Sequence, residues 1–93
     1  VLFRSNARLT TVEQNWQLLR EMAVLQEFGK DILVGLSRKS FLFRPLGITP
    51  AEALPATQVA DFIALQNGAD ILRVHDVAEA VRTVNLYRLL NGI

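Results

Sequence analysis

Two basic side chains stand close together in an apolar segment late in the chain. Arg73 lies within Asp70–His75, where an ionised guanidinium is costly unless it meets an anion. In a strand, Arg73 and His75 share one face. A helix expected to begin at Asp76 adds free backbone N–H groups at the same end. These residues predict a site for an oxyanion such as phosphate or pyrophosphate. The open alternative is that Arg73 pairs with an acidic neighbour and His75 helps to cap the helix.

A second polar segment, Ser37-Arg38-Lys39-Ser40, directly follows the apolar run Asp31–Leu36. If the two apolar runs are neighbouring strands, this segment lies beside the anion site. Lys39 would then reach a ring nitrogen or carbonyl of a ligand, and a flanking serine would donate or accept a hydrogen bond. The alternative is a solvated basic loop.

The segment Phe41–Pro45 is expected to continue this loop. Phe41 and Phe43 alternate with basic residues, a composition also found in platforms that stack single-stranded nucleic acid. A formal net charge of +1 argues against that interpretation, because it supplies no general attraction to a polyanion.

The spacing of apolar residues predicts the helices that surround these segments. One helix is expected over Thr10–Phe28 and ends at Gly29, and another over Thr57–Gln66 is closed by Asn67-Gly68. A third follows the last apolar run.

Two sequence patterns indicate where helical segments begin. Thr49-Pro50-Ala51-Glu52 predicts a capping box and a short helical turn that stops near Pro55. Asp76-Val77-Ala78-Glu79 predicts a second capping box, and the helix that it starts is expected to end at Asn91-Gly92.

The run Asp31–Leu36 is too short for a helix and nearly continuously apolar, which is typical of a parallel strand buried on both faces. The run Asp70–His75 is predicted to be a second strand. Their starts, Gly29–Leu33 and Gly68–Leu72, are identical at four of five positions, 39 residues apart. A repeated strand–helix unit gives adjacent parallel strands. A (β/α)8 barrel needs eight such units and ~250 residues, so we expect this chain to be the C-terminal part of a larger α/β architecture.

The composition indicates one globular piece: 93 residues, 51% hydrophobic and 20% charged. The absence of cysteine excludes disulfides, thiolate metal sites and a cysteine nucleophile. Charged residues interrupt every apolar stretch before the ~18–20 residues of a membrane span, so we expect no membrane association. The absence of cysteine fits an intracellular origin, and we expect a cytoplasmic location. Residues 1–8, which begin without Met and without a signal-peptide pattern, are expected to be a remnant outside the family sequence.

Two motifs in this order resemble one enzyme family. Val34–Phe41, which reads VGLSRKSF, together with Ala64–Val77, which reads ALQNGADILRVHDV, is similar to the C-terminal part of dihydropteroate synthase. The similarity extends back through Thr11–Asn15 and so covers roughly 10–90. It implies a partial pterin-binding (β/α)8 TIM barrel domain over residues 1–93, holding the sixth helix and the last two strand–helix units.

The resemblance implies a transferase of folate biosynthesis that condenses hydroxymethyl-dihydropterin diphosphate with p-aminobenzoate, releasing pyrophosphate. It implies that Lys39 contacts the pterin near the p-aminobenzoate pocket, that Ser40 lines that pocket, and that Arg73 and His75 bind the diphosphate. It further implies magnesium, with ligands outside this chain, small-molecule substrates, no nucleic acid partner, and a homodimer.

The chain also departs from the family pattern. Val1–Leu9 stands where the family has a glycine-rich Asp-Pro-Gly segment, and Ala56-Thr57 replaces the Gly-Thr of many members. The pterin-reading residues of the earlier strands are expected outside this chain, so the chain alone is expected to be inactive. Two alternatives stay open: a related pterin-binding methyltransferase barrel, and a non-catalytic interaction module that associates through exposed sheet edges.

Overall fold

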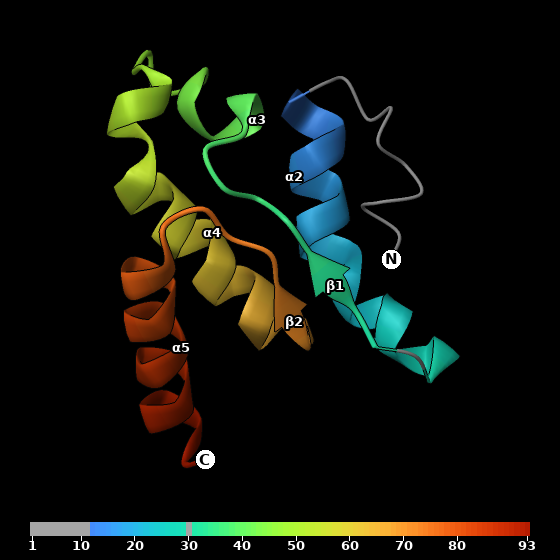
Figure 1. Ribbon diagram of the computed structural model, residues 1–93. Coiled ribbons are helices and arrows are strands. Elements are labelled where there is room, and N and C mark those ends of the chain that lie inside the picture. Colours follow the sequence, from blue (N-terminus) through green and yellow to red (C-terminus); the bar gives the residue numbers. More distant parts are fainter. Residues whose placement is uncertain (1–11, 30) are drawn as a thin grey trace.

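The computed structural model describes residues 12–29 and 31–93, and it alternates helices with two short strands (Figure 1). The expectation for residues 1–8 and the predicted start of the first helix at Thr10 lie outside the described residues. The elements in chain order are α2 (Val12–Glu21), the 3-10 helix η1 (Met22–Phe28), β1 (Leu33–Val34), α3 (Ser40–Phe43), the 3-10 helix η2 (Pro50–Glu52), α4 (Leu54–Gln66), β2 (Ile71–Leu72) and α5 (Val77–Asn91).

The first predicted helix is present, with a change of pitch near its middle. The α-helix α2 continues directly into the tighter helix η1, which ends at Gly29 with a left-handed φ of 65°. Trp16 of α2 donates from Nε1 to the carbonyl oxygen of Phe41 at 3.1 Å, and the two rings meet edge to face at 5.2 Å. These contacts hold α3 against α2.

The two strands are adjacent and parallel, as the repeat predicted. Leu33 pairs with Ile71 and Val34 with Leu72, so partners are 38 residues apart, one fewer than the offset of the sequence repeat. Just before the strands, the backbone N–H of Ile32 donates to Oδ2 of Asp70 at 2.8 Å. The strands are shorter than the predicted 31–36 and 70–75.

The sheet is buried on one face only, so the expectation that the strand in Asp31–Leu36 is buried on both faces was wrong. Ile32, Val34 and Leu36 alternate along the chain and are 4% exposed or less. They pack against apolar side chains of the helices: Leu19, Met22, Phe41, Leu42, Ala60 and Ala64. On the other face Leu33 is half-buried and Ile71 is 51% exposed, because in the described part of the chain the core is built on the helix side.

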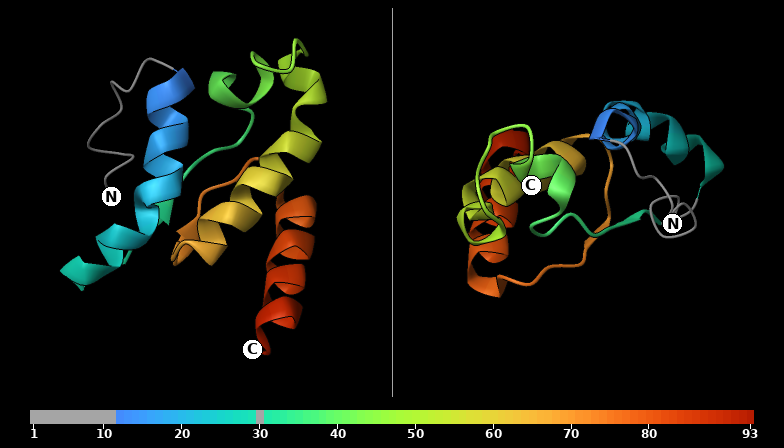
Figure 2. Two further views of the ribbon diagram at one scale, coloured as in Figure 1. Left: turned by 180° about the vertical axis from the view of Figure 1, so that it is seen from behind. Right: turned by 90° about the horizontal axis from the view of Figure 1, so that it is seen from above.

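Helices α4 and α5 pack together, and Figure 2 shows this pair at the opposite end of the molecule from α2. Phe62 and Tyr87 meet edge to face at 6.2 Å. The predicted capping box at Thr49 is present, with the backbone N–H of Thr49 donating to Oε1 of Glu52 at 2.9 Å. Helix α4 begins at Leu54, three residues earlier than predicted, because Pro55 fits its first turn instead of ending the preceding one.

Gly68 ends the turn between α4 and β2 with a φ of 104°. A Cβ at this position would overlap the side chain of Gln26. The left-handed backbone conformation therefore favours glycine here, and a larger residue would also have to displace the Gln26 side chain. Among residues 12–29 and 31–93, no helix has the length and apolar character needed to span a bilayer.

Candidate functional site

The loop after β1 begins with a tight turn. The backbone N–H of Lys39 donates to the carbonyl oxygen of Leu36 at 3.2 Å, which closes a four-residue turn. Its third residue, Arg38, has a φ of 51°, a left-handed conformation that usually belongs to glycine or asparagine at this position. An arginine is retained there only if the surroundings hold it.

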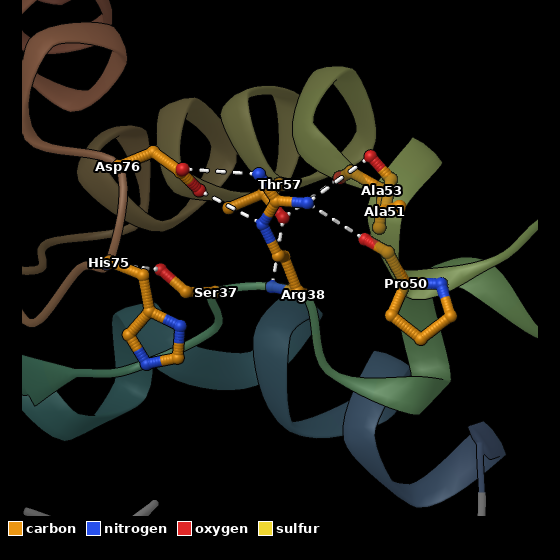
Figure 3. A network of polar contacts seen from close by, with 8 residues as sticks. All are labelled: Ser37, Arg38, Pro50, Ala51, Ala53, Thr57, His75 and Asp76. Atoms are coloured by element: carbon orange, nitrogen blue, oxygen red, sulfur yellow. Dashed lines mark hydrogen bonds and ion pairs between the residues drawn. The ribbon is translucent and has the colours of Figure 1, made fainter.

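Arg38 is held by hydrogen bonds to three other segments (Figure 3). Its backbone N–H donates to Oγ1 of Thr57 at 3.0 Å. Its guanidinium donates from Nε and Nη2 to the two carboxylate oxygens of Asp76, both at 3.1 Å, and from Nη1 to the carbonyl oxygens of Pro50 and Ala51 at 3.0 and 3.2 Å. The loop after β1 is thus joined to η2, α4 and the start of α5.

The second predicted capping box was wrong. Asp76 is the residue before α5, but its side chain makes no capping hydrogen bond to the helix. The Arg38 guanidinium offers it two parallel charge-assisted N–H groups, which is the preferred geometry for a carboxylate. The hydrogen bond from Arg38 lowers the pKa of Asp76, and the same hydrogen bond raises the pKa of Arg38.

Arg73 lies where the two strands end. Its backbone N–H donates to the carbonyl oxygen of Val34 at 2.8 Å. Its Cβ would be 3.6 Å from a Cβ built on Gly35, so the stem of the side chain lies beside β1 on the open face of the sheet. Arg73 is exposed and forms no ion pair within residues 12–29 and 31–93. The alternative in which an acidic neighbour neutralises it is therefore not found in the described chain.

His75 is exposed and follows two residues later. Its backbone N–H donates to Oγ of Ser37 at 3.1 Å, so the loop after β2 is bonded directly to the loop after β1. Figure 3 shows its imidazole turned away from the Arg38 guanidinium.

Lys39 and Ser40 are exposed at the start of α3. The structure brings their loop beside His75 through Ser37, but no hydrogen bond within the described residues joins the side chains of Lys39 or Ser40 to Arg73 or His75. Exposed cations at the ends of adjacent strands, together with the free N–H groups of α5, form an arrangement that suits a phosphate-like ligand.

The expectation of a continuous loop over Phe41–Pro45 was wrong, because Ser40–Phe43 is helical. Phe41 and Leu42 are each 2% exposed and belong to the core, which draws this segment into a helical turn. A buried Phe41 ring cannot stack on a base, so the nucleic-acid platform considered for this segment has lost one of its two aromatic members.

Elsewhere in the described chain, fewer polar groups are placed to bind a ligand. A groove of about 440 Å³ lies on the side of β2 opposite Arg73 and is mainly apolar, and its lining includes Leu72, Val74 and Val81. Within the residues that the structure describes, no group of three or more His, Asp or Glu side chains is placed to hold a metal ion.

Helices joined to adjacent parallel strands define the class: an α/β protein, with basic side chains in the loops that follow the carboxyl ends of its strands. Proteins of this class usually build their ligand sites at that end of the sheet. The family described as "pterin binding enzyme" matches residues 7–75. The chain belongs to this family.

Three relatives illustrate the similarity. The dihydropteroate synthase of Escherichia coli strain K12 is 37% identical over 75 residues, which are 81% of this chain and 27% of that protein. A crystal structure of the Yersinia pestis dihydropteroate synthase is 32% identical with a TM-score of 0.86, over 90% of this chain and 35% of that one. The enzyme from Xanthomonas albilineans, solved with 7,8-dihydropteroate, is 33% identical with a TM-score of 0.85, over 90% of this chain and 32% of that one.

The chain thus spans about a quarter of the length of the Escherichia coli relative. Its helices and two parallel strands are part of a (β/α)8 TIM barrel, as the sequence predicted. The sequence predicts Lys39, Ser40, Arg73 and His75 as site residues, and all four lie just after the two strands. It did not indicate the link between Arg38 and Asp76. No local signal in the sequence indicates a pair of residues so far apart.

Proposed function

We propose that the protein to which this chain belongs is a dihydropteroate synthase. The reaction is the condensation of hydroxymethyl-dihydropterin diphosphate with p-aminobenzoate, giving dihydropteroate and pyrophosphate for folate biosynthesis. The enzyme is then a transferase, and this chain carries the leaving-group side of its site.

The observation that carries the proposal is the position of Arg73. This exposed cation lies on the open face of the sheet at the strand ends, beside Gly35, and has no ion-pair partner in the described chain. His75 follows two residues later, just before α5. A diphosphate is an anion that such a pair suits. The match to the pterin binding family supports a pterin as the group that carries it. The relatives named dihydropteroate synthase support the same reaction.

The chemistry assigns each residue a part. The amino nitrogen of p-aminobenzoate attacks the pterin methylene carbon, and the bond from that carbon to the diphosphate oxygen breaks. The electron pair leaves with the oxygen, and the amine loses a proton. Arg73, His75 and the first N–H groups of α5 stabilise the negative charge on the departing pyrophosphate. Lys39 contacts the pterin, and Ser40 lines the p-aminobenzoate side.

Three further properties belong to the same proposal. The enzyme uses magnesium, which stabilises charge on the diphosphate when it is bound. Its ligands are expected in the part of the protein outside this chain, as the resemblance to dihydropteroate synthase implies. The protein acts in the cytoplasm as a homodimer, and size-exclusion chromatography with light scattering tests the dimer.

The whole protein should form dihydropteroate when it is incubated with the pterin diphosphate, p-aminobenzoate and magnesium. Chromatography of the product and an assay for released pyrophosphate measure the reaction. The 93-residue chain alone should form none, because positioning both substrates needs the rest of the barrel. A pure, folded whole protein that binds pterin but releases no pyrophosphate would overturn the proposal.

The role of Arg73 is tested by Arg73→Ala in the whole protein. Loss of a charged hydrogen-bond donor should weaken binding of the pterin diphosphate by about 10- to 100-fold. Binding of p-aminobenzoate should change much less. Arg82→Ala, at an exposed arginine of α5, serves as the matched control. Equal losses for both substrates would mean that Arg73 is structural.

A further inference from the structure

The contacts of Arg38 set it apart from the other basic residues of the two motifs. Lys39 and Arg73 are exposed, whereas the Arg38 guanidinium is occupied by a carboxylate and two carbonyl oxygens. A guanidinium with these partners has little capacity left for an incoming anion. Its role at the site must therefore be exercised through its neighbours.

The bonds between the two loops follow the register of the strands. Val34 pairs with Leu72 at a separation of 38 residues. Beyond the strands, Ser37 accepts from the backbone of His75, and Arg38 binds Asp76, again 38 residues apart in both cases. Side-chain bonds thus continue the pairing of the two chain segments after the backbone ladder has ended.

We propose that Arg38 is a positioning residue for the proposed synthase reaction: by binding Asp76 and by its left-handed backbone, it fixes Lys39 relative to His75. This inference rests on the proposed function. Arg38 acts on Lys39 through the peptide bond that joins them, and on His75 through Asp76, the next residue along the chain.

The backbone of Arg38 is held independently of its side chain. Its N–H donates to Oγ1 of Thr57, and that hydroxyl donates in turn to the carbonyl oxygen of Ala53 at 2.9 Å. Thr57 is 3% exposed. Because the hydroxyl proton is committed to Ala53, a lone pair remains for Arg38, and the position of the turn is tied to the first turn of α4.

The identity of the side chain matters for the same reason. Asparagine or glycine would adopt the left-handed φ with less strain. Neither can donate two parallel N–H groups to Asp76 and a third to the carbonyl oxygens of η2. Lysine keeps the charge but offers a point donor in place of the planar fork. Arg38→Lys therefore keeps the positive charge at this position and removes the two parallel donors, so its effect reports on the donor geometry alone.

The test compares Arg38→Lys, Asp76→Asn and the double variant in the whole enzyme, with Arg82→Lys as the matched control on α5. Misplacing Lys39 relative to His75 should lower kcat by about 10- to 100-fold. KM for each substrate should change less than about threefold, and the double variant should be no worse than the more impaired single variant, because both remove the same link. Arg82→Lys should match the wild type.

Hydrogen exchange gives a readout that does not depend on activity. The His75 amide, bonded to Ser37, should exchange faster in Arg38→Lys and in Asp76→Asn than in the wild type. If the wild type makes no dihydropteroate, the proposed function fails while exchange still tests the link. If Arg38→Lys does not fold, Asp76→Asn carries both measurements.

Three outcomes would overturn the inference. The first is unchanged kcat and KM in variants that merely unfold at lower urea concentration, since this shows a structural role alone. The second is unchanged exchange at His75. The third is a loss of affinity for the pterin diphosphate in Arg38→Lys as large as in Arg73→Ala, because that would make Arg38 a direct ligand of the anion.

Discussion

A buried carboxyl group on α4 makes the stability of this protein depend on pH. Asp61 is 2% exposed and lies on the helix face that also carries Thr57 and Leu65, each one turn away. Burial raises its pKa from 3.8 to about 6. Between these two pH values the folded protein keeps the proton, whereas the unfolded chain releases it.

The sign and size of the effect follow from this difference. Since the folded state binds more protons, the free energy of unfolding falls as the pH rises from about 4 to about 6, and it stays lower above that range. At about 1.4 kcal/mol per pKa unit, the full penalty near pH 7 is on the order of 3 kcal/mol. Asp61→Asn removes the ionisable group with little change of shape.

Urea unfolding of the wild type and of Asp61→Asn, followed by circular dichroism from pH 4 to pH 8, measures the penalty. The variant should gain up to about 3 kcal/mol over the wild type between pH 4 and pH 7, on top of a constant offset. Asp61→Ala should show the same pH dependence with a different offset. A stability difference that is the same at pH 4 and pH 7 would refute the reasoning.

Three substitutions test the packing in the same urea assay. Leu19→Ala, at a fully buried position, should cost about 2–5 kcal/mol, and a loss below about 1 kcal/mol would show that Leu19 is not in a rigid core. Trp16→Phe should cost roughly 0.5–1.5 kcal/mol because Phe41 loses its donor, and an unchanged midpoint would contradict that bond. Gly68→Ala should cost more than about 1 kcal/mol, because alanine resists a φ of 104° and meets Gln26; a neutral result would rule out that conformation.

The features predictable from sequence were those with local causes. The helix ends at Gly29 and Gly92 follow from glycine's tolerance of a left-handed φ, and the capping box at Thr49 follows from residues three apart. The parallel pairing of the strands followed from the repeat. The two copies of the repeat are 39 residues apart, whereas paired residues of the strands are 38 apart. In the same register, the backbone N–H of Ile32 donates to the side chain of Asp70.

The features that sequence reasoning missed depend on partners distant in the chain. Asp76 has the pattern of a helix cap, but a guanidinium 38 residues earlier competes for its carboxylate. Phe41 follows a polar run, but contact with Trp16 buries it and makes the segment helical. In both cases the deciding interaction is tertiary, and local propensity cannot reveal it.

The pairing of Arg38 with Asp76 also constrains how this protein can change over time. Each residue lies inside one of the two motifs, so neither motif can vary independently of the other. A substitution at Arg38 leaves the Asp76 carboxylate without its ion-pair partner, and a substitution at Asp76 leaves the Arg38 guanidinium without its carboxylate. Homologues that lose one of these residues should have altered the other as well. Transplanting either motif into a different barrel should fail unless its counterpart is moved with it.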